Sequence, residues 1–230
     1  MNELQQELEH QDAETILNWA FTSFSPEEIV IACSFQIEDQ VICDMAIAGQ
    51  HDVSILTIDT LRLNQEIYDT IRLFENKYGI RVQKIYPDSE EIQKMTAEKK
   101  ENSFLNSKQD REACCFFRKV KPLAKSLTGK KAWITGLRRE QSYNRKCIQK
   151  IEQDTRFNII KINPLADWTL QEVWDYIKKQ NIPYCVLYDR GYTSIGCEPC
   201  TRPATDPADI RSGRWWWETD SSRECGMHEK

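Results

Sequence analysis

The chain has 230 residues, of which 40% are hydrophobic and 29% are charged, and its formal net charge is −5. This composition is typical of a globular protein with a sizeable core, and no apolar run reaches the roughly 18 residues of a membrane span, so we expect no membrane attachment. The negative net charge argues against a general nucleic-acid-binding protein but allows a local basic pocket.

The first twenty residues, MNELQQELEHQDAETILNWA, are acidic and amphipathic. They lack the basic and apolar regions of a signal peptide, so we expect a cytoplasmic protein. The nine cysteines are an odd number. In a reducing compartment they are better interpreted as ligands, nucleophiles or buried apolar residues than as a disulfide framework.

Hydrophobic periodicity predicts alternating helices and strands along the chain. The predicted helices are 3–20, a segment around 41–46 that ends at Gly49, 64–78, and 170–180, which a Thr169–Glu172 capping box opens. Short apolar runs, typical of buried parallel strands, cover 29–33, 53–58, 80–85, 131–135 and 157–162.

The alternation of strands and helices predicts right-handed crossovers and an open, mostly parallel sheet with helices on both faces. We therefore expect a doubly wound α/β fold, formed by 1–230 as a single domain. Its nucleotide-binding core would cover about 25–190, and a cysteine-rich C-terminal tail of about 191–230 would fold back on it.

The turn at 34–39 joins the first predicted strand to a helix. Ligands of such sheets bind beyond the carboxyl ends of the strands, so Ser34 and the following backbone amides are candidates for holding a phosphate. Asp59-Thr60 ends the next strand and would lie beside this turn. The turn contains no glycine and matches no phosphate-loop fingerprint, so a plain loop capped by Ser34 and Asp39 is the alternative, with Glu38 complementing the helix dipole.

Four cysteines form two tight pairs, Cys114-Cys115 and Cys197-x-x-Cys200, which is enough for zinc or for an iron–sulfur cluster. Neighbouring side chains diverge on a helix or strand, so adjacent cysteines suit a cluster, whose thiolates meet separate irons, better than one zinc ion. Four buried apolar cysteines are the alternative. The other internal cysteines have apolar or mixed neighbours and are interpreted as core residues or spectators: Cys33, Cys43, Cys147 and Cys185.

Basic residues gather near these cysteines and in the tail. Arginine binds phosphate or sulfate bidentately and lysine acts as a point charge, so an anionic substrate is indicated, with solvated surface charge as the alternative. Arg138-Arg139, directly after a predicted strand, is the most pocket-like pair. The candidates are Arg118, Lys119, Arg138, Arg139, Arg145, Arg202, Arg211 and Arg214.

Cys225 has polar neighbours, unlike a core cysteine. A nucleophilic thiol needs partial exposure and cationic surroundings, and His228 lies three residues further on. We interpret Cys225 as a nucleophile. An inert exposed thiol, or a metal ligand together with His228, is the alternative.

Four segments together resemble the cluster-containing assimilatory adenylylsulfate reductases, relatives of the phosphoadenylylsulfate reductases. The resemblance extends from Ser34 to His228, and its most specific parts are CCFFRKVKPL at 114–123, GCEPCTRP at 196–203, GRWWWE at 213–218 and ECGMH at 224–228. It implies the ATP-pyrophosphatase-like fold of the adenine nucleotide alpha hydrolases. One departure is Gln36-Ile37, where the family often has small residues in its phosphate loop.

The resemblance implies an oxidoreductase of sulfate assimilation and cysteine biosynthesis. It would reduce adenosine 5′-phosphosulfate to sulfite and AMP through an S-sulfocysteine, with thioredoxin as electron donor. One 4Fe–4S cluster would be bound by Cys114, Cys115, Cys197 and Cys200. Cys225 would be the nucleophile, with Lys119 and His228 beside the reacting group, and the substrate would contact Ser34, Glu38, Asp39, Thr60, Arg138, Arg139, Arg145, Arg211 and Arg214.

Other functions remain open at this stage. The 3′-phosphorylated substrate, alone or with the unphosphorylated one, is the nearest alternative, and glutaredoxin is an alternative donor. A tRNA-thiolating enzyme would need a glycine-rich loop that CSFQIEDQ lacks. A zinc-stapled binding module leaves Cys225 unexplained. A homo-oligomer is compatible with the sequence, and no nucleic-acid partner is expected.

Overall fold

The computed structural model describes residues 3–206 and 209–218. Their strands form one sheet in the order β3-β2-β1-β4-β6-β5. All neighbours are parallel except β5 and β6, which are antiparallel. The α/β class with a mostly parallel sheet, predicted from the sequence, is confirmed. The strands are β1 (Ile29–Ala32), β2 (Ile55–Ile58), β3 (Gln83–Ile85), β4 (Ala132–Ile134), β5 (Ile151–Asp154) and β6 (Ile159–Ile162).

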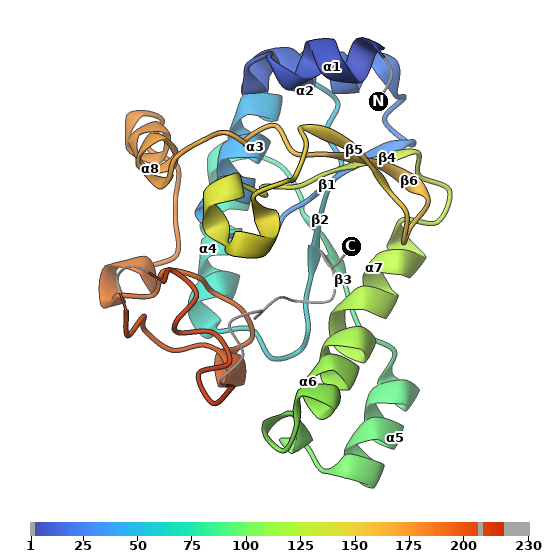
Figure 1. The fold of residues 1–230 in the computed structure, drawn as a ribbon, viewed down its shortest axis with the longest axis vertical. Helices are drawn as coiled ribbons and strands as arrows, with labels where there is room; N and C mark the ends of the chain where they lie inside the picture. The colour runs from blue at the N-terminus through green and yellow to red at the C-terminus, as the bar shows by residue number, and fades with distance from the viewer. Residues whose placement is uncertain (1–2, 207–208, 219–230) are drawn as a thin grey trace.

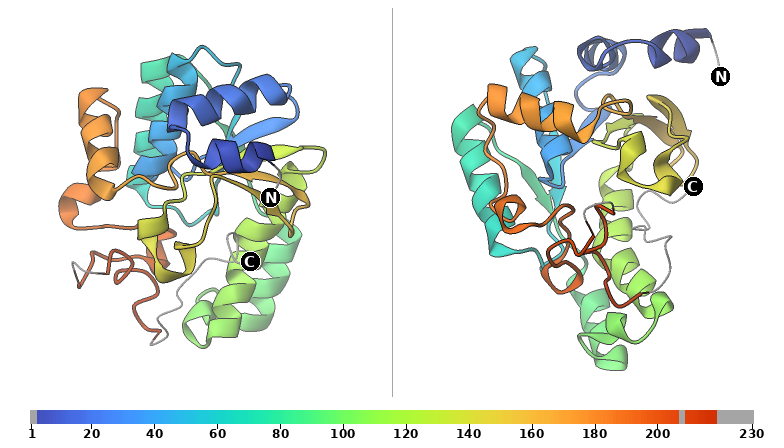
Figure 2. Two further views of the ribbon diagram at one scale, coloured as in Figure 1. Left: turned by 45° about the horizontal axis from the view of Figure 1, so that its top comes forward. Right: turned by 60° about the vertical axis from the view of Figure 1, so that its left-hand side comes forward.

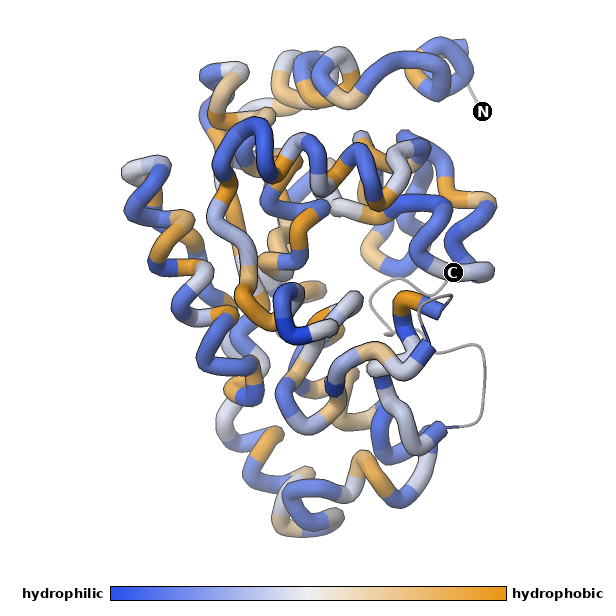
Figure 3. The backbone as a smooth tube through the Cα atoms, turned by 90° about the vertical axis from the view of Figure 1, so that its left-hand side faces the viewer, coloured by the Kyte–Doolittle hydropathy of each residue, from blue (hydrophilic) through white to orange (hydrophobic). Residues whose placement is uncertain are grey.

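Helices cover both faces of the sheet (Figures 1 and 2). The larger core lies under α2, α3, α4 and α8, and the smaller core lies between the sheet and α7. Along the helices, apolar residues alternate with polar ones (Figure 3). This pattern is typical of helices that pack one face against a core and expose the other. The helices are α1 (Glu3–Glu9), α2 (Ala13–Ser23), α3 (Ile37–Ala48), α4 (Gln65–Tyr78), α5 (Ser89–Lys99), α6 (Lys108–Cys115), α7 (Lys121–Ser126) and α8 (Leu170–Lys179).

Local signals explain where several helices begin and end. The expected helix over 3–20 is broken by Asp12, which caps α2 by accepting a hydrogen bond from the Thr15 amide at 2.7 Å. The Thr169–Glu172 capping box opens α8 as predicted. Gly79 ends α4 in the left-handed conformation, with φ of 65°.

The chain after α8 contains mainly short 3₁₀ turns and packs back against the sheet domain. A β-bridge joins Leu63 to Cys197, and a second joins Thr201 to Arg214. This orange-to-red segment lies beside the lower end of α4 in Figure 1. It therefore brings the second cysteine pair to the end of the sheet where β1 and β2 stop. Among the described helices, none combines the length and apolar character of a membrane span.

Candidate active site

A cavity of about 140 Å³ lies beyond the carboxyl ends of β1, β2 and β4. This is the position at which open α/β sheets bind ligands. Its wall combines the turn after β1, the loops after β2 and β4, and the segment that follows α8. The structure brings eight of the predicted site residues to this wall: Ser34, Glu38, Asp39, Thr60, Lys119, Arg145, Arg211 and Arg214.

Asp39 ties together two strand ends at the floor of the cavity. Its Oδ2 accepts hydrogen bonds from the Ser34 amide at 2.7 Å and the Ser34 hydroxyl at 2.6 Å. Its Oδ1 accepts a bond from the Gly136 amide at 2.9 Å. A Cβ added at Gly136 would lie 2.4 Å from Oδ1, so only glycine permits this approach. Because both carboxylate oxygens are engaged by protein donors, the arrangement suits Asp39 to positioning the turn rather than to contacting a ligand.

Burial raises the pKa of the Asp39 carboxyl to about 6, although hydrogen bonds from Ser34 and Gly136 oppose the rise. An aspartate with a raised folded-state pKa stabilises the fold while protonated, and this contribution is lost as pH rises through about 6. We therefore expect wild type to lose up to about 3 kcal/mol relative to Asp39→Asn between roughly pH 4 and pH 7. The unfolding free energies of wild type and Asp39→Asn, measured across this pH range, check this prediction. A difference that does not change with pH would contradict it.

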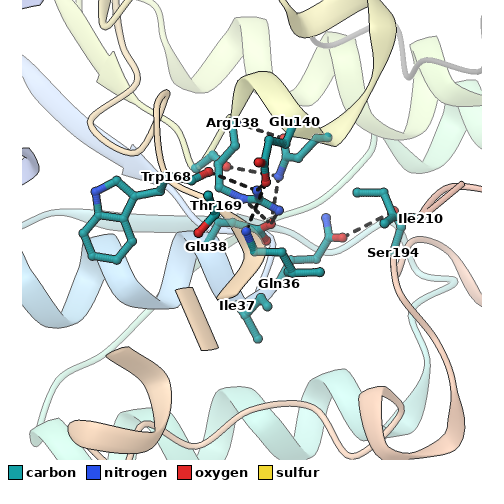
Figure 4. A network of polar contacts seen from close by, with 12 residues as sticks. Gln36, Ile37, Glu38, Arg138, Glu140, Trp168, Thr169, Ser194 and Ile210 are labelled. Atoms are coloured by element: carbon teal, nitrogen blue, oxygen red, sulfur yellow. Dashed lines mark hydrogen bonds and ion pairs between the residues drawn. The ribbon is translucent and has the colours of Figure 1, made fainter. Parts of the chain in front are cut away.

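Gln36, the departure noted in the sequence, connects the turn after β1 to the segment after α8. Its Oε1 accepts hydrogen bonds from the Ile195 amide at 3.1 Å and from the Ser194 hydroxyl at 3.5 Å (Figure 4). The preceding Phe35 is buried and has φ of 60°, a conformation that usually favours glycine. Phe35 thus adopts a backbone conformation that glycine takes more easily, and the side chain of the next residue, Gln36, ties the turn to the segment after α8. The sequence reasoning missed this role, because the partners are about 160 residues away in sequence.

Glu38 faces a buried arginine. Arg138 Nε and Nη2 lie 3.0 and 2.9 Å from Glu38 Oε1, and Arg138 Nη1 donates to the Trp168 carbonyl at 3.1 Å (Figure 4). Gln141 Nε2 also donates to Glu38 Oε1, at 3.0 Å. Arg138 is completely buried and is absent from the described cavity wall. It therefore compensates the charge of Glu38, which does line the cavity.

Arg139 points away from the cavity toward the N-terminal helices. It forms ion pairs with Glu9 and Asp167, and its Nε donates to the Ile148 carbonyl at 2.9 Å. Like Arg138, it is not one of the described wall residues. We expected these two adjacent arginines to form the most pocket-like basic pair. Instead, four carboxylates pair with them: Glu38 and Glu140 with Arg138, and Glu9 and Asp167 with Arg139.

A second, smaller cavity is lined by both cysteine pairs: Cys114, Cys115, Cys197 and Cys200. The first pair ends α6, where a π-helical turn, Phe116–Val120, begins. Such turns are frequent at functional sites because they redirect side chains. Cys200 ends a 3₁₀ turn that Cys197 caps. Both pairs thus line one space, the first from the end of α6 and the second from a 3₁₀ turn.

Basic side chains surround the second cavity, whose lining includes Arg62, Arg111, Arg118, Lys119 and Arg214. Burial raises the pKa of the Cys200 thiol to about 12, with Cys197 adding to the rise and Lys119 opposing it. Burial also raises the pKa of Cys114, and Arg118 opposes that rise. These opposing charges mean that an anionic group at the thiols would be compensated by adjacent cations.

The four thiols line one cavity and together form a donor set for a soft metal group. Over the described ranges, no group of three or more His, Cys, Asp or Glu residues is recognised as a ready-made site for one metal ion. A cluster accepts thiolates at separate irons, around a wider space. The donor set and its neighbouring cations are compatible with such a cluster, which stays a prediction.

The two cavities are neighbours with shared walls. Lys119 and Arg214, both buried, line both of them. Thr60 lies at the boundary, with its Oγ1 3.2 Å from Cys197 Sγ and its carbonyl accepting from Arg118 Nη1 at 2.9 Å. Any charge held at the cysteines would therefore act directly on the residues that face the strand-end cavity.

The predicted nucleophile Cys225 and its neighbour His228 lie outside the described residues. Of the remaining cysteines, Cys147 is exposed and three are buried: Cys33, Cys43 and Cys185. The buried ones lie in the larger core, although Cys33 also reaches the cavity wall.

The fold and its strand-end cavity define an α/β protein like the adenine nucleotide alpha hydrolases. Candida glabrata FMN adenylyltransferase in complex with ATP shares this fold, with a TM-score of 0.61 at 18% identity, over 88% of this chain and 64% of that one. A closer similarity is to a crystal structure of phosphoadenylyl-sulfate (PAPS) reductase from Candida auris, a phosphate complex. That match has a TM-score of 0.72 and 27% identity, and covers 85% of this chain and 93% of that one.

Sequence comparison narrows the class further. The model of the phosphoadenosine phosphosulfate reductase domain family matches residues 28–203. The adenosine 5′-phosphosulfate reductase of Geobacillus kaustophilus is 44% identical, over 96% of this chain and 91% of the relative. The protein of the same name from Agrobacterium fabrum is 45% identical, over 86% and 76%. The chain belongs to the phosphoadenosine phosphosulfate reductase family of oxidoreductases.

Proposed function

We propose that this protein reduces adenosine 5′-phosphosulfate to sulfite and AMP, with thioredoxin as electron donor. The observation that carries the proposal is the pair of adjacent cavities, one at the strand ends and one lined by four cysteines, with Lys119 and Arg214 in both walls. The names of the relatives that align over most of the chain support the same substrate. The reaction belongs to assimilatory sulfate reduction and cysteine biosynthesis, which we place in the cytoplasm.

The nucleotide occupies the strand-end cavity in this proposal. Ser34 and Thr60 face it from two strand ends, and Glu38 offers a carboxylate whose charge Arg138 compensates. Arg145, Arg211 and Arg214 bring cations to the same wall, where they would bind the phosphosulfate. Arg138 and Arg139 support the wall from behind. Residues 1–230 act as one reductase domain, with the core at about 25–190 and the cluster-binding, catalytic tail at about 191–230.

Cys114, Cys115, Cys197 and Cys200 would hold one 4Fe–4S cluster in the second cavity. When bound, the cluster supplies a fixed local charge beside the substrate pocket. Lys119, which lines both cavities, then remains between the cysteines and the sulfate group. Its ammonium stabilises the charge that develops on the transferring group.

The thiolate of Cys225 attacks the sulfur of the phosphosulfate, and the S–O bond breaks with its electron pair leaving on AMP. This step forms an S-sulfocysteine. A thioredoxin thiolate then attacks Cys225 Sγ, so that sulfite leaves and a mixed disulfide remains, which the second thioredoxin thiol resolves. The dithiol supplies both electrons and becomes a disulfide. His228 assists beside the nucleophile.

A second candidate substrate is the 3′-phosphorylated nucleotide, because the structural relative from Candida auris is a PAPS reductase. Both substrates are tested by measuring sulfite and AMP, or adenosine 3′,5′-bisphosphate, formed by anaerobically purified protein with thioredoxin. We expect the unphosphorylated substrate to give at least about a tenfold higher kcat/KM, which corresponds to about 1.4 kcal/mol of discrimination. Equal values indicate dual use. Sulfite from neither substrate would contradict the proposal. The same assay with glutaredoxin in place of thioredoxin identifies the electron donor.

A further inference from the structure

Three guanidinium groups surround one buried indole at the junction of the two cavities. The Cζ atoms of Arg111 and Arg214 each lie 4.6 Å from the centre of the Trp215 ring, and that of Arg211 lies 5.6 Å away. The indole is only 1% exposed. Arg211 and Arg214 line the strand-end cavity, whereas Arg111 lines the cysteine cavity. One aromatic ring therefore contacts arginines that line both cavities.

The backbone at Trp215 is strained, since its φ is 44° and the residue is neither glycine nor asparagine. Strain of this kind persists only where the surrounding structure enforces it, and it gathers at functional sites. The segment is held by a hydrogen bond from the Trp215 amide to the Cys200 carbonyl, at 3.2 Å. The indole is thus fixed at a defined position beside the second cysteine pair.

Arg214 lies against this ring and also contacts two residues of the segment after α8. Its Nη1 donates to the Ser194 hydroxyl at 3.2 Å, and its buried Nε has no hydrogen-bond partner within the described part of the chain. A Cβ added at Gly196 would lie 2.4 Å from Arg214 Nη2, so the guanidinium lies directly against the chain at Gly196. The ring and this glycine hold a buried cation in place, with hydrogen-bonding capacity left for a ligand.

We propose that Trp215 is a positioning residue for anion binding. Its ring holds the guanidinium groups of Arg211 and Arg214 at the cavity wall, where they receive the phosphate or sulfate oxygens of the ligand. Arg111 anchors the ring from the cysteine side, and its own charge is matched by Glu218 at 2.6 Å. This inference rests on the proposed function, which brings the phosphate of an adenosine nucleotide to this wall.

The energetic argument is that arginine side chains are otherwise costly to order. Each carries a large rotamer entropy, which must be lost when the ligand binds unless the side chain is already held. A desolvated cation–π contact is worth roughly as much as that cost. Removing the ring should therefore weaken binding even though it removes no group that touches the ligand.

The test compares AMP binding by calorimetry in holoprotein carrying Trp215→Leu or Trp215→Phe. We expect roughly five- to thirtyfold weaker binding for Trp215→Leu, which is about 1 to 2 kcal/mol, and a smaller loss for Trp215→Phe, whose ring retains a weaker π face. Trp216→Leu is the matched control. Arg202 lies 4.9 Å from the neighbouring Trp216 ring and is not one of the described residues lining either cavity, so AMP affinity should stay at the wild-type value.

A double-mutant cycle separates positioning from a general loss of structure. Trp215 also packs against Cys197 and Phe104, so iron content and melting temperature are measured in every variant. If Trp215 acts through the arginines, Trp215→Leu should cost less than about twofold in an Arg211→Ala/Arg214→Ala background. If the loss is equally large there, the inference is overturned.

Two further outcomes are distinguishable. Wild-type AMP affinity in Trp215→Leu overturns the inference alone and leaves the proposed function standing. Failure of wild type to bind AMP overturns the proposed function together with the inference. If Trp215→Leu does not fold, the comparison of Trp215→Phe with Trp216→Phe carries the test, and equal affinities in those two variants count against the inference.

Discussion

Replacing Cys200 by serine is expected to strip the protein of iron and to reduce sulfite formation to background. Cys200 is buried in the second cavity with three other thiols, and Lys119 and Arg214 lie beside it. A serine hydroxyl does not replace a thiolate as a soft ligand, so one site of the cluster would be lost. Iron and sulfide per chain, and the broad visible absorbance near about 400 nm typical of such clusters, measure the effect.

The matched control is Cys147→Ser. Cys147 is exposed and is not part of the described lining of either cavity, so this variant should keep wild-type iron content and activity. Serine variants of Cys114, Cys115 and Cys197 should behave like Cys200→Ser. Full iron in two or more of the four would overturn the ligand assignment, and one zinc per chain in wild type would favour the structural-metal alternative.

The sequence predicted strands correctly where burial restricts their composition. Apolar runs located β1, β2, β4 and β6, because a strand covered on both faces excludes polar side chains. The antiparallel edge strand β5, with sequence IEQD, carries no such signal, since it is buried only in part. The helix expected over 3–20 is broken because the side chain of Asp12 offers a cap that competes with helix continuation.

Only part of the site geometry could be predicted from the sequence, and Arg138 and Arg139 show why. Arg138 and Arg139 follow a strand end, as ligand-binding residues do, yet their positions depend on carboxylates 100 and 130 residues away. Nothing in the local pattern reveals that Glu38 and Glu9 will compete for them. Gln36 was noted only as a departure, for the same reason. Residues that follow strand ends directly, such as Ser34 and Thr60, do line the strand-end cavity, because the sheet itself brings strand ends together.

The adjacent cysteines illustrate a different limit. On a regular α-helix, neighbouring side chains are about 100° apart, so the sequence predicted one site for both pairs without predicting how Cys114 and Cys115 reach it. Both cysteines lie in α6, and the π-helical turn that begins at Phe116 has no distinct sequence signature in FFRKV. The chemistry of the pair was therefore accessible from residue type, while its geometry required the structure.

The variant Cys225→Ser should eliminate the covalent step and leave the binding steps intact. Cys225 is the only cysteine of the chain that follows both cysteine pairs. The proposed mechanism needs a nucleophile that is not a cluster ligand, because a thiolate bound to iron has its lone pairs engaged. We therefore expect this variant to contain wild-type iron and to bind AMP normally, while sulfite formation falls to background.

The covalent intermediate gives a direct measurement. Wild type mixed with adenosine 5′-phosphosulfate and no thioredoxin should gain the mass of one sulfonate, about 80 Da, on the peptide containing Cys225 and should release AMP once per site. Adding thioredoxin should remove that mass and release sulfite. Cys147→Ser should form the same adduct as wild type, which excludes a general effect of removing a thiol. An adduct on another cysteine, or sulfite formation by Cys225→Ser, would overturn the assignment of Cys225 as the nucleophile, because the S-sulfocysteine would then form at another residue.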